Sequence, residues 1–179
     1  MHEQGRFKHM PRGPIGIHIE PRSPEWSLAI EQCLGPLILS FICGSYEDER
    51  LMHELIARHV PHVNKRPRVI VSDFSAQLYD VQRYRPENRQ YPTVYEMIRC
   101  DDPIVANTLF DMRKIESILL LPDREVGRNM IEKGNCGSNC HEAFLMNGDQ
   151  LLGKPSYRAY ACPIKAARLF IDNPDHVIK

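Results

Sequence analysis

The chain has 179 residues, of which 42% are hydrophobic, enough to build a core for one or two domains. Its 23 basic and 23 acidic residues balance, so any contact with nucleic acid or a membrane must come from a local cluster of charge. The longest apolar runs, LGPLILSFIC and IESILLL, are too short to cross a bilayer.

The six cysteines occur in a sequence whose amino terminus, MHEQGRFKHMPRG, lacks the apolar segment of a secretory signal. Cys33 and Cys43 fall on predicted apolar helix and strand positions, as expected of reduced thiols in a core. We therefore expect a protein of the cytosol or nucleus.

The first predicted elements are a strand and a helix. Residues 13–20 alternate with a period of two, which is typical of a strand. Ser23 offers an N-cap followed by a proline at the first helical position, and Gly35 with the proline after it should stop this helix after about Leu34.

Two buried strands and the helix between them should follow. Leu37–Cys43 is apolar on both faces, as in a central strand, and the acidic residues after it should open a helix over 46–59. The triplet at 69–71 predicts the second strand. The stretch 80–92 is polar, rich in Arg and Tyr and without periodicity, which predicts a loop, and residues 93–100 fit a short helix or a strand.

The carboxy-terminal half begins with Asp102 and a proline, which should open a helix. The elements predicted after it are a strand over 115–121, an amphipathic helix after the acidic turn 122–125, a strand over 142–146, a turn at 147–148, an extended stretch over 151–161 and a short helix around 164–171. No heptad pattern persists, so the sequence predicts no coiled coil of its own.

One pattern occurs twice in the chain. It reads AIEQCLGPLILSFICGSYEDERLMHELI from Ala29 and VANTLFDMRKIESILLLPDREVGRNMI from Val105. Each copy predicts a short apolar helix, a tight link, a buried strand, an acidic turn and an amphipathic helix. Two such copies usually share one core, and a pseudo-symmetric body often pairs with another like itself. The prediction is an α/β fold built from two repeated helix–strand–helix lobes.

Two motifs suggest phosphate or metal binding, but each lacks residues that such a site requires. Gly148–Lys154 matches the first seven positions of a phosphate-binding loop, but Pro155 stands where magnesium binding needs Ser or Thr, and the next residues look extended. Cys136, Cys140 and His141 are soft metal ligands without a second ligand pair at finger-like distance. We therefore expect no metal, no cofactor and no catalytic activity, with a small nucleotide-binding enzyme using Gly148–Lys154 as the alternative.

Basic and aromatic residues gather at two places and predict a nucleic-acid surface. Cations neutralise phosphates, and aromatic rings stack on unpaired bases, as single-stranded nucleic acid requires. The candidates are Lys65, Arg66, Arg68, Arg83, Tyr84, Arg85, Arg89 and Tyr91. The competing interpretation is a solvated Arg-rich loop on a neutral protein.

Several ordered motifs between residues 13 and 160 resemble one family. They are RGPIGIHI, SPEWSLAIEQCLG, RPRVIVSDF followed by YDV, PIVANTLFDMRKIESILLL and NCHEAFLMNGDQ. They resemble the hinge domain of the structural maintenance of chromosomes (SMC) family, and within it the hinges of the SMC five/six complex. The resemblance implies a compact α/β hinge over 13–161, with lobes of about 13–80 and 93–161 joined by the Arg/Tyr-rich loop, and tails at 1–12 and 162–179.

The resemblance also implies a function without catalysis. Such a hinge would pair with the hinge of subunit five, close one side of a chromosome-entrapping ring in the nucleus, serve DNA repair and contact DNA, preferably single-stranded. A scaffold that binds protein but not DNA is the blander alternative. Because open strand edges invite pairing, the expected interface residues are Gly35, Phe144, Leu145, Met146, Gly148, Leu151 and Leu152.

Overall fold

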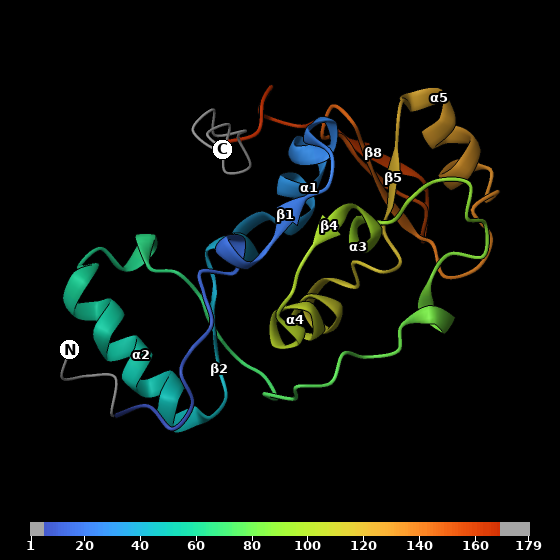
Figure 1. Cartoon of the computed structure of the whole chain (residues 1–179). Helices are drawn as coiled ribbons and strands as arrows, with labels where there is room; N and C mark the ends of the chain where they lie inside the picture. Colours follow the sequence, from blue (N-terminus) through green and yellow to red (C-terminus); the bar gives the residue numbers. More distant parts are fainter. Residues whose placement is uncertain (1–5, 169–179) are drawn as a thin grey trace, which may run out of the picture. The chain divides into compact units, whose positions relative to one another are not determined.

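The computed structural model describes residues 6–168, which form two compact units (Figure 1). The first unit comprises the residues up to Ile19, then Gly35–Tyr79 and Cys100–Met112. The second comprises Glu20–Leu34, Asp80–Arg99 and the residues from Arg113 onward. Each unit therefore draws on several separate segments of the chain, whereas the sequence predicted two continuous lobes.

The first unit is built on a strand–helix–strand connection. Strands β2 (Phe41–Cys43) and β3 (Val69–Val71) pair in parallel, and helix α2 (Tyr46–His59) connects them. The Ser45 hydroxyl accepts a hydrogen bond from the Asp48 N–H at 3.2 Å and caps α2. Acidic residues in the first turn and basic residues in the last complement the helix dipole. The predicted bounds of this helix are confirmed.

The amino-terminal segment covers the other edge of β2. Backbone hydrogen bonds of 2.9 and 2.7 Å join Arg12 and Ile42, and the Ile15 N–H donates to Ser40 at 2.9 Å. The predicted strand over 13–20 is wrong: residues Ile15–His18 form a 3₁₀ turn, and only Glu20–Pro21 form a strand, β1. The apparent alternation misled, because Ile15 and Ile19 are buried while Ile17 between them is 72% exposed.

Both repeat copies enter their strand through a turn with positive φ. Helix α1 (Ser27–Leu34) ends before Gly35 at φ 50°, and helix α4 (Pro103–Arg113) ends before Lys114 at φ 54°. This left-handed residue is the common way to end a helix, and it explains a glycine at the first site. The strands are therefore shorter than predicted, since β2 begins at Phe41 and β5 (Leu119–Leu121) at Leu119.

The second unit contains a four-stranded sheet in the order β5-β6-β7-β8. Strand β6 (Glu142–Leu145) lies parallel to β5, and β7 (Gln150–Leu152) and β8 (Arg158–Tyr160) follow antiparallel. Helix α5 (Arg124–Gly127) continues into a π-helical turn over 128–132, and α1 packs on β6. The core cluster consists of Leu119, Leu121, Met130, Ile131, Cys136, Cys140, Ala143, Leu145 and Leu151.

The repeated pattern is confirmed at the level of connections. The order β2–α2–β3 in the first unit matches β5–α5–β6 in the second, with parallel pairing in both. The leading helices do not stay with their own strands, because α1 belongs to the second unit and most of α4 to the first. Each copy of the repeat therefore has its leading helix mainly in one unit and its strand in the other.

Two further predictions concern residues 93–100 and the segment 164–171. Residues 93–100 hold both expected elements, helix α3 (Val94–Met97) and strand β4 (Ile98–Arg99), and β4 pairs antiparallel with β1. The helix expected around 164–171 does not form over 164–168, and 169–171 lie outside the described residues. Among the helices of residues 6–168, none has the length and apolar character needed to cross a bilayer.

Candidate nucleic-acid and partner surfaces

A cation stacked on a ring stands at the tip of the Arg/Tyr-rich loop. Gln82–Tyr84 form a 3₁₀ turn in the second unit. The Arg83 guanidinium lies 4.7 Å from the centroid of the Tyr84 ring and donates to the Tyr84 hydroxyl at 2.6 Å. Tyr84 is 45% exposed. The pair presents a positive charge and an aromatic face to solvent, which is the combination that unpaired bases and phosphates require.

Arg85 has a different role from its neighbours. Its guanidinium is ion-paired with Glu96, and its side chain is 13% exposed. Burial, with the nearby charge of Arg89, lowers the pKa of Arg85 below its usual value. The Glu96 carboxylate also accepts hydrogen bonds from the backbone and hydroxyl of Thr93, which closes the capping box of α3. Arg85 therefore positions the loop on α3.

The other two candidates in this loop, Arg89 and Tyr91, differ in how far they are exposed. Arg89 is exposed and available for phosphate contact. Tyr91 is half-buried against the core cluster of the second unit, so its ring is partly used in packing. In this loop the structure favours Arg83, Tyr84 and Arg89 as the surface residues.

A second loop, residues 134–141, holds this one in place. The Asn139 side-chain amide donates to the backbone oxygens of Arg83 at 2.9 Å and Arg85 at 3.4 Å. Glu87 and Ser138 exchange hydrogen bonds, and the Asn88 N–H donates to the Cys136 oxygen at 3.2 Å. These contacts between the two loops could not be predicted from local sequence, because the partners lie about 50 residues apart.

Lys65, Arg66 and Arg68 lie in the first unit, between α2 and β3. Lys65 and Arg68 are exposed, whereas Arg66 is half-buried and its Nε donates to the Val60 oxygen at 2.9 Å. The two predicted basic clusters therefore belong to different units. Each must be tested as a surface of its own.

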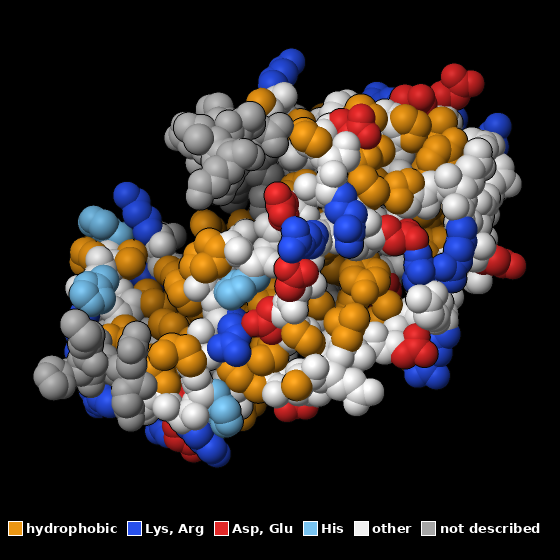
Figure 2. Space-filling view, in the orientation of Figure 1, with side chains coloured by type: hydrophobic (Ala, Val, Ile, Leu, Met, Phe, Trp, Pro, Cys, Tyr) orange, Lys and Arg blue, Asp and Glu red, His pale blue; other side chains and the backbone are white. Residues whose placement is uncertain are grey.

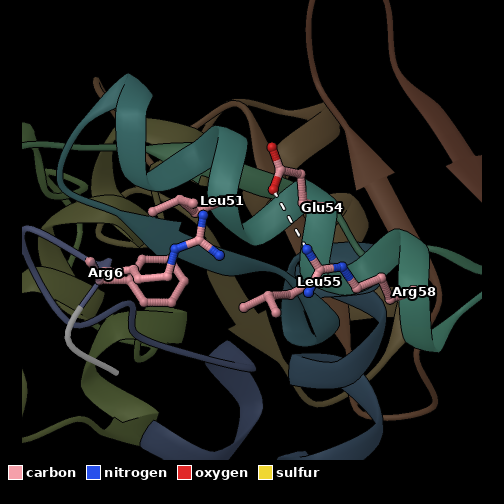
Figure 3. A pocket seen from close by; sticks show the side chains of 6 residues that line it. Arg6, Leu51, Glu54, Leu55 and Arg58 are labelled. Atoms are coloured by element: carbon pink, nitrogen blue, oxygen red, sulfur yellow. Dashed lines mark ion pairs between the residues drawn. The ribbon is translucent and has the colours of Figure 1, made fainter. Parts of the chain in front are cut away.

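Helix α2 adds cations that the sequence analysis did not single out. A small pocket lies between the amino-terminal segment and α2, and Figure 3 shows the side chains that line it. Leu51, Leu55 and Phe7 supply apolar surface there, and the Arg6 and Arg58 guanidinium groups stand at its sides. Histidine and basic side chains are visible around this helix in Figure 2. Arg58 is also ion-paired with Glu54 at 3.9 Å, which reduces its positive field.

The strand edges differ from those expected. Strands β6 and β7 are each paired on both sides, so the reasoning that Phe144–Leu152 offers an open edge is wrong. Phe144, Leu145, Gly148 and Leu151 are buried, and Met146 and Leu152 are half-buried. Among the described residues, the open edge of this sheet is β8, whose three residues are all exposed.

The outer edges of β5 and β3 can be assessed in the same way, by asking what each is hydrogen-bonded to. The outer side of β5 is covered, because the Leu120 N–H donates to Pro92 at 2.8 Å and Thr93 bridges Leu119. In the first unit β3 pairs only with β2 among the described residues, and its three side chains are half-buried. Among the described residues, β3 in the first unit and β8 in the second are therefore strands with an open edge.

Comparison with known proteins identifies the fold. No protein-family model matches the chain. Structural maintenance of chromosomes protein 6 of Takifugu rubripes is 40% identical over 158 residues, which cover 88% of this chain and 14% of that protein. The solved Smc5/6 hinge domain of S. pombe matches with a TM-score of 0.76 at 27% identity, covering 90% of this chain and 61% of that one. The chain is an SMC-type hinge domain, most similar to that of subunit six.

A more distant hinge shares the fold. The SMC hinge domain of Geobacillus stearothermophilus, solved as an asymmetric dimer, matches with a TM-score of 0.55 at 16% identity, over 89% of this chain and 61% of that one. This SMC hinge chain spans 14% of the length of the curated relative from Takifugu rubripes.

The phosphate-loop motif does not have the required geometry in this SMC hinge. Gly148 lies in the turn between β6 and β7 at φ 84°, and the next residues belong to β7. Bends and strand β8 follow Lys154, where a phosphate-binding loop would open a helix. Among residues 6–168, no group of three or more His, Cys, Asp or Glu side chains is placed to hold a metal ion.

Two predicted interface residues, Gly148 and Gly35, have positive φ, and of these two Gly35 has open space where a Cβ would stand. An added Cβ would meet no atom within 4 Å, so space does not require a glycine there. The positive φ does, because side chains rarely adopt it. Its role in pairing stays a prediction.

Proposed function

We propose that this chain is the non-catalytic pairing hinge of an SMC subunit six, which joins the hinge of subunit five and contacts single-stranded DNA. The observation that carries the pairing is the pair of open strand edges, β3 and β8, one in each unit of an SMC hinge fold. An exposed edge offers unpaired backbone groups to a partner strand.

Two relatives support the choice of partner. The S. pombe structure is that of a Smc5/6 hinge domain, and the Geobacillus hinge was solved as a dimer. Subunit five is therefore the natural partner for a hinge most similar to subunit six. Joined in this way, the two subunits would close one side of a ring around chromosomal DNA in the nucleus and act in DNA repair and chromosome maintenance.

DNA contact is a separate part of the proposal. It is supported by the exposed Arg83–Tyr84 stack, by the exposed Arg89 in the same loop, and by the basic residues after α2. Cations on these loops would neutralise phosphates while the Tyr84 ring stacks on a base. A hinge that binds protein alone is the competing outcome.

Two assays test the parts independently. Purified subunit-five hinge on a column should retain this chain at 0.15 M salt, and failure of retention would contradict pairing. Fluorescence anisotropy should show tighter binding of an oligothymidylate than of a duplex of equal length, with affinity falling as salt rises. If neither nucleic acid binds, the protein-only scaffold is the better description.

A further inference from the structure

Two thiols of the 134–141 loop are buried in the same core cluster. Cys136 and Cys140 are free and buried, with 2% and 4% of their surfaces exposed. As a thiol, Cys136 donates to the Cys140 backbone oxygen, with Sγ 3.4 Å from that oxygen. The Cys140 thiol in turn lies 3.9 Å from the Glu142 backbone oxygen, to which it donates. The loop thus buries both thiols in one core cluster, with the Cys136 sulfur against the backbone of Cys140.

The two sulfurs differ in acidity. The hydrogen bond from the Cys140 thiol lowers the pKa of Cys136 to about 7 against the effect of burial, and the charge of Lys154 adds to the lowering. The same contact, with burial, raises the pKa of Cys140. Burial raises the pKa of Cys33 to about 12 and that of Cys43 to about 11. A thiolate next to a protonated thiol is the arrangement of a reactive cysteine with its resolving partner.

The residues around the two buried thiols, 134–135 and 137–139, are exposed. Gly134, Gly137 and Asn139 all have positive φ, between 59° and 75°, and all three are exposed. Such a loop can open without unfolding the sheet beneath it. Small oxidants can therefore reach Cys136 through a local motion.

We propose that Cys136 and Cys140 form a reversible disulfide with peroxides as oxidants, and that this bond alters the hold of the 134–141 loop on Arg83–Asn88. The Cys136 thiolate attacks a peroxide oxygen, the O–O bond breaks, and a sulfenic acid and water form after proton transfer. The Cys140 sulfur then attacks the sulfenic sulfur and displaces water. In total, two thiols and one hydrogen peroxide give one disulfide and two waters.

The consequence for the Arg/Tyr-rich loop follows from shared hydrogen bonds. The Cys136 backbone oxygen accepts from the Asn88 N–H at 3.2 Å, and the Ser138 oxygen accepts from the Glu87 N–H at 3.2 Å. A covalent bond between the two sulfurs imposes a specific side-chain and Cα geometry, so its formation should move the backbone that carries both acceptors. Any effect on DNA binding rests on the function proposed above.

The disulfide itself is tested by peptide mass analysis. The native chain is treated with hydrogen peroxide, alkylated and digested, with and without dithiothreitol before alkylation. We expect the peptide with Cys136 and Cys140 to lose two hydrogens and escape alkylation, and dithiothreitol to restore both thiols. Cys140→Ser should abolish the disulfide, whereas Cys100→Ser, a change at a half-buried thiol in the other unit, should leave it intact. Full alkylation of both thiols at doses that oxidise Cys162 would overturn the proposal.

The coupling is tested by amide hydrogen exchange on the same samples. Oxidation should change exchange at Glu87 and Asn88 at least threefold and leave the amides of α2 unchanged. Identical exchange at Glu87 and Asn88 would refute the coupling. Oligothymidylate binding is then compared before and after oxidation. If the reduced chain does not bind it, the DNA part of the proposed function fails, while the mass and exchange results still decide the disulfide.

Discussion

Glu87 and Ser138 are hydrogen-bonded to each other in both directions although 51 residues separate them in the sequence. The Glu87 N–H donates to the Ser138 backbone oxygen, and the Ser138 N–H and hydroxyl both donate to the Glu87 carboxylate, all at 3.2 Å. This exchange fixes the base of the loop that carries Arg83 and Tyr84. The candidate DNA surface is therefore a held loop rather than a free one, and its residues can be tested one by one.

Reversing two exposed charges tests the DNA surface. Arg83→Glu with Arg89→Glu should weaken binding of an oligothymidylate at least tenfold, because two phosphate contacts become repulsive. The slope of log affinity against log salt should also fall by about 1.4, since each single-strand phosphate contact contributes about 0.7. Anisotropy titrations at several salt concentrations measure both quantities.

Arg22→Glu is the matched control for that experiment, because Arg22 is an exposed cation elsewhere in the same unit. It should leave affinity within about twofold. Unchanged binding in the double variant would move the site to Lys65, Arg66 and Arg68.

An ion pair joins Arg113 to the sheet of the second unit, to which Arg113 itself belongs. The Arg113 guanidinium donates to both Glu142 oxygens at 2.7 and 2.5 Å, and its Nε donates to the Cys33 oxygen at 2.8 Å. Both side chains are less than a quarter exposed. Glu142→Gln should lower the free energy of unfolding by about 2–3 kcal/mol, because Arg113 keeps its charge without a matching carboxylate.

Urea denaturation of both variants measures this difference. The control is Glu132→Gln, which removes an exposed pair with Arg128 and should cost less than about 0.5 kcal/mol. Equal stabilities of the two variants would mean that the Arg113–Glu142 pair contributes no more than a surface pair.

The Asp48 carboxylate should make the first unit sensitive to acid. Burial alone would raise its pKa, but hydrogen bonds from the N–H groups of Lys8 and His9 and from Ser45 outweigh burial and lower it. A carboxyl whose folded pKa is depressed stabilises the fold above its unfolded pKa, and this contribution is lost as the pH falls through the folded pKa. The loss should therefore occur below about pH 4.

The test compares the native chain with Asp48→Asn over pH 2–7. At neutral pH the variant should lose about 1–3 kcal/mol, because two backbone donors lose a charged acceptor. The difference between the two proteins should shrink as the pH falls below about 4. A difference independent of pH would contradict the assigned role of this carboxylate.

Nucleotide should not stabilise the chain. Because the Gly148–Lys154 segment forms a hairpin turn and a strand, ATP with magnesium should leave the melting temperature of the native chain unchanged. The melting temperature of Lys154→Ala should also stay the same when ATP and magnesium are added. Differential scanning fluorimetry measures both. A rise in the native chain that Lys154→Ala removes would revive the nucleotide-binding alternative.

Local signals in the sequence were read correctly where neighbours in the chain decide the structure. Helix α2 has its predicted bounds because Ser45, the acidic first turn and the apolar spacing all act within the helix. The strand over 13–20 failed because a 3₁₀ turn also buries Ile15 and Ile19 four residues apart. When only three apolar residues alternate, the sequence pattern alone does not distinguish a strand from a 3₁₀ turn.

The surfaces depend on contacts that sequence spacing does not reveal. Arg85 looked like a phosphate ligand until its ion pair with Glu96 and its burial were known. The edge expected at Phe144–Leu152 disappeared because β8 pairs with β7 and takes the edge position. Both errors arise from pairing between residues that are distant in the sequence.

A substitution on strand β8 tests whether its open edge takes part in pairing with the partner hinge. Lysines and prolines on an edge strand oppose strand addition. Tyr160→Lys on β8 should weaken the complex with the subunit-five hinge at least tenfold. Tyr46→Lys, which changes an exposed ring on α2, should not. A thermal melt of each variant confirms that it is folded before the comparison.

The most direct test of the pairing hinge is the mass of the mixture in solution. Equimolar purified subunit-five hinge and this chain are passed through size exclusion with multi-angle light scattering at micromolar concentration. The proposal predicts one peak with the summed mass of one copy of each chain. Two peaks at the separate monomer masses would contradict it.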